Sequence, residues 1–152
     1  MLPDGNWIGR GRFITREHVL GEPIECLFKV SSEDPGIIIE GFQEPEGSAP
    51  RREFSIVISA DESGTYELDV HFGDWSLAGT AKLESQPCLG LVWSEDGRLH
   101  ATFALFDLAN GHGLRGIIHA AGAVISWELA LQEHHRAMGG DNVVTLSARR
   151  RR

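Results

Sequence analysis

The sequence predicts an all-β domain, namely an antiparallel up-and-down β-barrel of about ten strands. Short runs in which apolar and polar residues alternate recur along the chain, with turn residues about every eight to twelve positions. The 152 residues, 41% hydrophobic and 24% charged, suffice for a single core. We therefore expect one barrel domain over residues 1–148 and a basic tail over residues 149–152.

The first third of the chain predicts four strands, at residues 6–17, 24–31, 36–42 and 53–60. The segment GFQEPEGSAPRR (41–52) carries Pro and Gly and predicts a long loop. Such a loop is either a lid over the barrel mouth or a mobile connection.

The clearest hairpin is YELDVHF-GD-WSLAGTAKL, with Gly73 and Asp74 as its two-residue turn. This turn sets Phe72 opposite Trp75 and gives one apolar face and one polar face. The hairpin therefore predicts two neighbouring strands with one face toward a core.

Two further loops, ADESGTY (60–66) and WSEDGRL (93–99), place acidic and polar residues before a glycine. A tight turn that ends in a left-handed residue requires this order. The first loop sets Ala60 opposite Tyr66, and the second sets Trp93 opposite Leu99. Both registers point these side chains toward the interior.

Two more hairpins are predicted near the end of the chain, with turns at 110–111 and 121–122. Their pairing sets Phe103 opposite Ile118. After the last of these strands, a short helix around residues 132–138 is possible, because helix formers there are closed by glycines.

The register of the final hairpin has two supports. Trp127 lies across from Gly116 and can cover it. On the opposite face Arg115 lies across from Glu128, a pair of opposite charge. The segment NVVTLSA that follows the predicted helix is a further candidate strand.

The predicted interior is rich in aromatic side chains and poor in ionisable ones. Small residues on the same face leave space, which favours a barrel that holds a small apolar or aromatic ligand over a solid one. The aromatic candidates for ligand contact are Trp7, Phe13, Tyr66, Trp75, Trp93, Phe103 and Trp127.

Polar candidates come from the first strand and the loop after it. Arg12, Arg16 and His18 would lie at the barrel mouth and could pair with a ligand carboxylate. Tyr66 is the single titratable residue among the inward positions from the fourth strand onward, and general acid–base catalysis needs such groups. An isomerase or cyclase acting on an apolar substrate through the mouth residues is therefore the alternative to a binding protein.

The opening stretch GNWIGRG (5–11) resembles the Gly-x-Trp-x-Gly-x-Gly start of nitrobindin-like proteins, in the calycin superfamily of lipocalins and fatty-acid-binding proteins. The resemblance implies a ten-stranded barrel with an apolar cavity. In the nitrobindins it also implies haem, held by a histidine near the C-terminus. The matching place here falls near Asp141 or Asn142, so His134 and His135 are the remaining candidates for a haem ligand.

The glycines Gly9 and Gly11 in this stretch have two interpretations. They allow a flat ligand to approach the backbone, or they allow the first strand to coil sharply and close the barrel. We expect no other cofactor, since the histidines lack metal-ligand spacing, and Cys26 and Cys88 are interpreted as buried free thiols.

The net charge of −8 argues against nucleic acid and anionic membranes as partners. The sequence shows neither a long apolar run nor a start typical of an export signal, so we expect a cytoplasmic protein. Apolar residues at outward positions of the last three strands, with Phe106 and Ile117 at their centre, predict a homodimer through that face.

Overall fold

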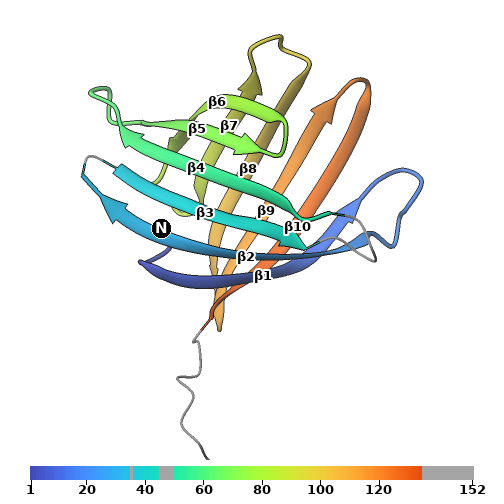
Figure 1. Ribbon diagram of the computed structural model, residues 1–152, viewed down its shortest axis with the longest axis horizontal. Coiled ribbons are helices and arrows are strands. Elements are labelled where there is room, and N and C mark those ends of the chain that lie inside the picture. The colour runs from blue at the N-terminus through green and yellow to red at the C-terminus, as the bar shows by residue number, and fades with distance from the viewer. Residues whose placement is uncertain (35, 45–49, 135–152) are drawn as a thin grey trace, which may run out of the picture.

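The computed structural model describes residues 1–34, 36–44 and 50–134, which form a closed barrel of ten antiparallel strands. The strands follow one another around the barrel, and β1 pairs with β10 to close it (Figure 1). The predicted fold class is confirmed. The strands are β1 (Gly5–Ile14), β2 (Glu22–Glu33), β3 (Gly36–Glu44), β4 (Arg52–Ala60), β5 (Tyr66–Phe72), β6 (Trp75–Lys82), β7 (Cys88–Ser94), β8 (Leu99–Leu108), β9 (Gly111–Ala120) and β10 (Ala123–Glu133).

β1 ends at Ile14, earlier than the predicted end at residue 17, and β2 (Glu22–Glu33) extends beyond the predicted range 24–31 at both ends. Two further segments are strand where the sequence predicted a loop or a helix. β3 continues to Glu44 and β4 begins at Arg52, so part of the predicted loop is strand. β10 continues to Glu133, where the sequence predicted the start of a helix. The rest of that helix, the segment NVVTLSA and the basic tail lie outside the described residues, as do residues 45–49 of the loop.

Most of the predicted registers are confirmed. Phe72 pairs with Trp75 across the β5–β6 turn, and Ala60 pairs with Tyr66. In the β9–β10 pair, Trp127 lies opposite Gly116 and its ring covers that glycine. Arg115 Nη2 donates to Glu128 Oε2 at 2.9 Å on the outer face, as expected.

The predicted β7–β8 register was wrong by one residue, which turns the side chains of β7 to the other face. Trp93 pairs with His100 instead of Leu99, faces outward and is 38% exposed. The hairpin loop contains residues 95–98, and Ser94 is the strand residue that faces inward next to it.

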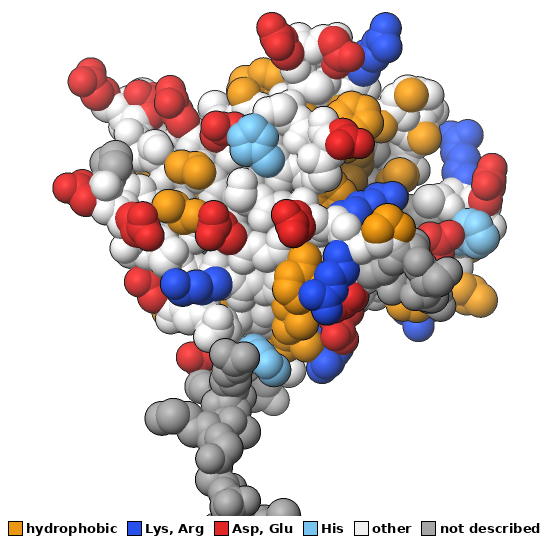
Figure 2. Space-filling view, viewed as in Figure 1, with side chains coloured by type: hydrophobic (Ala, Val, Ile, Leu, Met, Phe, Trp, Pro, Cys, Tyr) orange, Lys and Arg blue, Asp and Glu red, His pale blue; other side chains and the backbone are white. Residues whose placement is uncertain are grey.

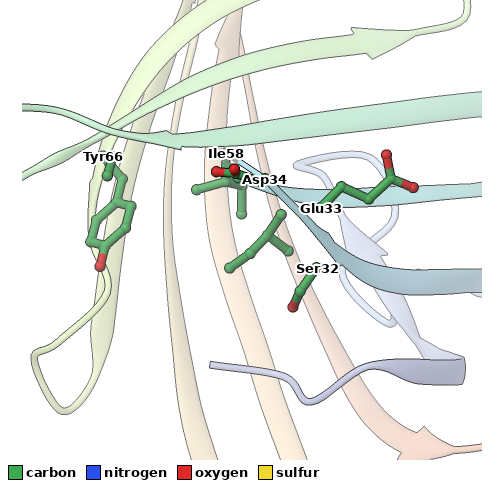
Figure 3. A pocket seen from close by; sticks show the side chains of 8 residues that line it. Ser32, Glu33, Asp34, Ile58 and Tyr66 are labelled. Atoms are coloured by element: carbon green, nitrogen blue, oxygen red, sulfur yellow. The ribbon is translucent and has the colours of Figure 1, made fainter.

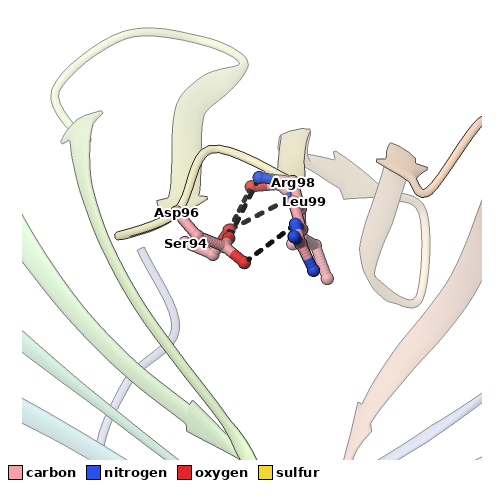
Figure 4. Close-up of polar contacts among 4 residues, drawn as sticks. All are labelled: Ser94, Asp96, Arg98 and Leu99. Atoms are coloured by element: carbon pink, nitrogen blue, oxygen red, sulfur yellow. Dashed lines mark hydrogen bonds and ion pairs between the residues drawn. The ribbon is translucent and has the colours of Figure 1, made fainter.

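Hydrogen bonds from the Ser94 side chain fix this hairpin (Figure 4). Ser94 Oγ donates to Asp96 Oδ1 at 2.6 Å and accepts from the Leu99 N–H at 3.0 Å. The Asp96 carboxylate also accepts from the Arg98 N–H at 3.0 Å. The turn therefore holds the Ser94 side chain on the inward face of β7, so the Trp93 side chain lies on the outward face.

The β8–β9 register differs from the prediction by two residues. Leu108 pairs with Gly111, so the turn is at 109–110 instead of 110–111. As a result Phe103 lies opposite Gly116 and not opposite Ile118. An even shift keeps each side chain on its predicted face, so Phe103 still points inward.

The buried side chains form two clusters inside the barrel. One is centred on Ile58, Leu68 and Val92, and the other on Trp7, Val30 and Leu131. Leu2 packs into the second cluster, so the segment before β1 covers one end of the barrel.

Candidate functional site

The interior of the barrel contains a cavity of about 260 Å³. Side chains at inward positions of β2 to β10, together with the start of the chain, make its wall. Prominent among them are Phe28, Phe54, Phe103, Leu114, Trp127 and Leu129. The sequence had placed Phe103 and Trp127 on this wall.

The barrel is hollow rather than filled by its own side chains. Phe28, Phe54 and Phe103 point inward yet are only half-buried, since part of their surface lies against the cavity. A cavity of about 150 Å³ lined by aliphatic and aromatic side chains holds one benzene molecule. The cavity here is therefore large enough for a molecule of about ten non-hydrogen atoms on the same scale.

The cavity wall contains two thiols. Cys88 Sγ donates to the Leu83 carbonyl oxygen at 3.0 Å and is buried. For Cys26, burial raises the pKa to about 11, and the negative charge of Glu25 adds to this rise. Cys26 is therefore a neutral thiol at physiological pH.

The sequence analysis did not place Cys26 on the wall, although the alternation of residues in β2 indicates that its side chain points inward. Ile24, Cys26 and Phe28 alternate with Glu25 and Leu27, so the charged residue marks the outward face.

Two aromatic rings on the wall lie over glycines of a neighbouring strand. The ring of Phe103 occupies the space that a side chain at Gly90 would need. The Cε2 and Cζ2 edge of Trp127 lies over Gly116, where a Cβ would be only 2.5 Å from either atom. The glycines therefore let large rings lie along the wall instead of crossing the interior.

Trp127 also contains a buried donor without a partner. Among the described residues, no acceptor lies within hydrogen-bonding distance of Trp127 Nε1, and the atom is shielded from solvent. The Nε1 of Trp7, in contrast, donates to the Pro3 carbonyl oxygen at 3.1 Å. Gln43 Oε1 is a second buried atom without a partner, but Gln43 is not part of the cavity wall.

The glycines of the opening stretch contact protein and not the cavity. A Cβ on Gly11 would overlap the Glu128 carbonyl oxygen, and one on Gly9 would be 2.9 Å from Leu131 Cδ2. These contacts support the interpretation that Gly9 and Gly11 allow close pairing of β1 with β10.

The polar residues predicted at the barrel mouth lie away from the cavity. Arg12 faces outward and donates through Nη1 to the Leu20 carbonyl oxygen at 2.7 Å. Arg16 and His18 are exposed in the loop after β1, where His18 Nε2 is 3.5 Å from Glu22 Oε1. The structure does not bring these three residues together with the aromatic wall.

Tyr66 lines a separate, open pocket at one end of the barrel, with Ser32, Asp34 and Ile58 (Figure 3). Glu33 also borders this pocket, but its side chain points away from Tyr66. Tyr66 therefore does not bring a proton-transferring group to the internal cavity.

The remaining aromatic candidates occupy the two ends of the barrel. Trp7 is buried and packs edge-on against His112, with ring centroids 5.6 Å apart. Trp75 is 48% exposed at the rim, on the same face of its strand as the cavity wall. Phe13 is half-buried on the inward face of β1 beyond the cavity.

The described residues of the cavity do not fit haem. The described part of the wall contains no histidine, and a cavity that holds about ten non-hydrogen atoms is too small for a haem macrocycle. The backbone N–H of His134 donates to the Asn6 carbonyl oxygen at 2.7 Å, and its side chain borders an outer groove. His135 lies outside the described residues.

The outer wall divides into two halves of different character. On the outward faces of β2 to β5, which we call the acidic half, acidic side chains dominate (Figure 2): Glu25, Glu33, Glu40, Glu44, Glu53, Glu67 and Asp69. On the outward faces of β6 to β10, which we call the apolar half, the described acidic side chain is Glu128, which pairs with Arg115.

Large apolar side chains are exposed on the apolar half. Leu89, Leu91 and Trp93 lie along β7, with Ile117 on β9 and Val124 on β10. Ile117 is 42% exposed, whereas the ring of Phe106 packs over Gly113. The apolar surface is therefore centred nearer β7 than the sequence indicated.

Comparisons of this chain with protein-family models, with curated proteins and with solved structures find no significant match. The residues that the structure describes include no helix of the length and apolar character needed to cross a membrane.

Proposed function

We propose that this protein binds one small apolar or aromatic molecule inside the barrel. The observation that carries the proposal is the cavity of about 260 Å³ with its almost purely hydrocarbon wall. A wall of this kind does not hold water well, so apolar cavities of this type stay dry and accept apolar guests. Burial of ligand surface contributes roughly 25 cal/mol per Å² before the costs of association.

A pair of alanine variants tests this proposal. Ala101 lines the cavity, and Ala104 lies on the outward face of the same strand, β8. Ala101→Leu fills part of the cavity and is expected to weaken binding of naphthalene more than about tenfold, because the guest no longer fits. Ala104→Leu adds the same atoms outside and is expected to leave the affinity unchanged.

The affinities are measured by NMR titration of the folded variants, with thermal unfolding as a check on their folds. If Ala101→Leu binds naphthalene as tightly as the wild type does, the ligand binds outside this cavity. Absence of binding of both naphthalene and toluene to the wild type at millimolar concentration would reject the proposal.

The two alternatives from the sequence have less support. For an isomerase or cyclase, the described wall offers no His, Asp, Glu, Lys or Tyr side chain, and its thiol Cys26 is neutral at physiological pH. For haem, the candidate ligand His134 borders the outer groove instead of the cavity. We therefore favour a ligand-binding protein of the calycin kind, and we keep the cytoplasm as its proposed location.

The division of the outer wall supports the proposed homodimer. Two copies that meet through their apolar halves place both acidic halves far apart, which reduces repulsion between chains of net charge −8. Adjoining exposed apolar side chains on neighbouring strands are typical of such interfaces.

A further inference from the structure

We propose that His100 and His119 chelate one divalent transition-metal ion, such as Zn²⁺, on the outer wall of the barrel. The proposed site lies outside the cavity, so it is independent of the proposed ligand binding. Three observations support it. The two histidines are paired across neighbouring strands, their rings are close and nearly parallel, and their ring nitrogens have no other partner among the described residues.

The pairing comes from the observed β8–β9 register. His100 lies directly opposite His119, and both side chains are exposed on the outer face. The predicted register, which set Phe103 opposite Ile118, would have left the two histidines unpaired. Directly opposite side chains have Cβ atoms about 4.5–5.5 Å apart, so two histidines in this arrangement can reach one metal ion. Their separation along the sequence does not reveal this proximity.

The two rings lie face to face. Their centroids are 4.6 Å apart and their planes differ by 11°. Zn²⁺ binds histidine nitrogen at about 2.0–2.1 Å in tetrahedral geometry, which sets two such nitrogens about 3.4 Å apart. Because both side chains are exposed, a small rotation of each one brings a nitrogen of each ring to a shared ion. Among the described residues no third His, Cys, Asp or Glu completes the set, so water occupies the remaining positions.

The ring nitrogens of His100 and His119 are not engaged elsewhere. In the part of the chain that the structure describes, neither ring has a hydrogen bond or an ion pair beyond the contact between the two rings. Three other histidines lie beside carboxylates: His18 beside Glu22, His71 beside Asp69 and His112 beside Asp107. A metal ion at His100 and His119 therefore displaces no existing interaction, and neutral imidazole is the commonest metal ligand in proteins.

The surroundings of the pair favour a transition metal over other cations. Trp93 lies next to His100 across β7–β8, and Val124 lies next to His119 across β9–β10, so apolar side chains flank the pair. The net charge of −8 attracts cations to the surface in general. Imidazole ligands select Zn²⁺, Cu²⁺ and Ni²⁺, whereas Mg²⁺ and Ca²⁺ prefer oxygen ligands. The two histidines therefore provide the selectivity.

A Zn²⁺ titration followed by NMR tests the site, because the ring resonances report on each histidine separately. The wild type is compared with His100→Ala, His119→Ala and His71→Ala, and thermal unfolding checks that each variant is folded. We expect either of the first two changes to weaken Zn²⁺ binding more than about tenfold, because a single ligand loses the effective concentration that its neighbour provides. His71→Ala is the matched control, since it removes an exposed histidine at an outward position of β5 and should leave the affinity unchanged.

Protons compete with metal ions for imidazole nitrogen, so the Zn²⁺ affinity should also fall steeply as the pH is lowered from about 8 to about 5. A His100→Ala or His119→Ala variant that binds Zn²⁺ as tightly as the wild type overturns the chelation. Equal shifts of the same resonances with Mg²⁺ would mean attraction by charge alone and overturn the selectivity. If millimolar Zn²⁺ leaves the resonances of both histidines unmoved, the site does not exist, while ligand binding in the cavity is unaffected.

Discussion

Gly11 determines how closely the first and last strands of the barrel approach each other. A Cβ at this position would overlap the Glu128 carbonyl oxygen of β10, a backbone atom that cannot move without displacing the strand. At Gly9 the nearest atom is instead Leu131 Cδ2, the end of a flexible side chain. The two glycines of one motif therefore differ in how much they constrain barrel closure.

This difference leads to a prediction about stability. Gly11→Ala is expected to lower the free energy of unfolding by about 3 kcal/mol or more, and Gly9→Ala by about 1 kcal/mol, as overpacking against backbone costs more than overpacking against a side chain. Urea denaturation of both variants measures these values. A larger loss for Gly9→Ala than for Gly11→Ala would contradict this account of closure.

At the same scale, the sequence predicted part of the candidate site. Phe103 and Trp127 were placed on the cavity wall because an even error in register keeps a side chain on its face. Arg12, Arg16 and His18 were expected at the mouth, but Arg12 donates to the Leu20 carbonyl oxygen and His18 lies beside Glu22, both outside the cavity. Such contacts depend on loop conformation, which residue alternation does not encode.

At the scale of the strand, β7 shows why one register could not be predicted. Its sequence CLGLVWS is apolar at both odd and even positions, so alternation does not distinguish the two faces. The length of the turn decides, and the side chain of Ser94 sets this length through its bonds to Asp96 and Leu99. A hydrogen-bonded serine in a turn resembles a solvent-exposed one in sequence.

The variant Ser94→Ala tests this turn. The Leu99 N–H loses its acceptor in the interior, so we expect the free energy of unfolding to fall by about 1–3 kcal/mol. Asp96→Ala is the control, because it leaves Ser94 bonded to Leu99 and should cost less. Denaturation of both variants checks this order, and equal losses would mean that the hydrogen bond between Ser94 and the Leu99 N–H contributes little to stability.

For Ser94→Ala we also predict a change in the pKa of Asp96. The hydrogen bond from Ser94, followed by that from the Arg98 N–H, holds the pKa of Asp96 below its ordinary value of 3.8. Because folding lowers this pKa, the interaction stabilises the fold above pH 3.8 and is lost as the pH falls through the folded-state pKa. In Ser94→Ala the Asp96 pKa should rise toward 3.8, which a carboxyl NMR titration measures; an unchanged pKa would exclude Ser94 as its main cause.

At the scale of the whole molecule, the sequence predicted the barrel class and most strand pairs, since turn residues and alternation act locally. The size of the cavity is not a local property. It depends on how inward side chains of β2 to β10 pack against one another across the barrel. The ring of Trp127 over Gly116 was predicted from one hairpin, whereas the ring of Phe103 over Gly90 requires the observed β7–β8 register. The position of the apolar half could not be predicted from the sequence either, because it depends on the observed register of β7.

The apolar half carries the last prediction, that the protein is a homodimer at micromolar concentration. Leu91→Asp with Ile117→Asp places carboxylates on this half and is expected to raise the dimer dissociation constant more than about tenfold, because buried charges would lack partners. Val57→Asp is the matched control, since Val57 is 36% exposed on the acidic half. Light scattering and analytical ultracentrifugation measure the masses. A monomeric wild type would rule out the dimer, and a double variant that remains dimeric would place the interface on another face.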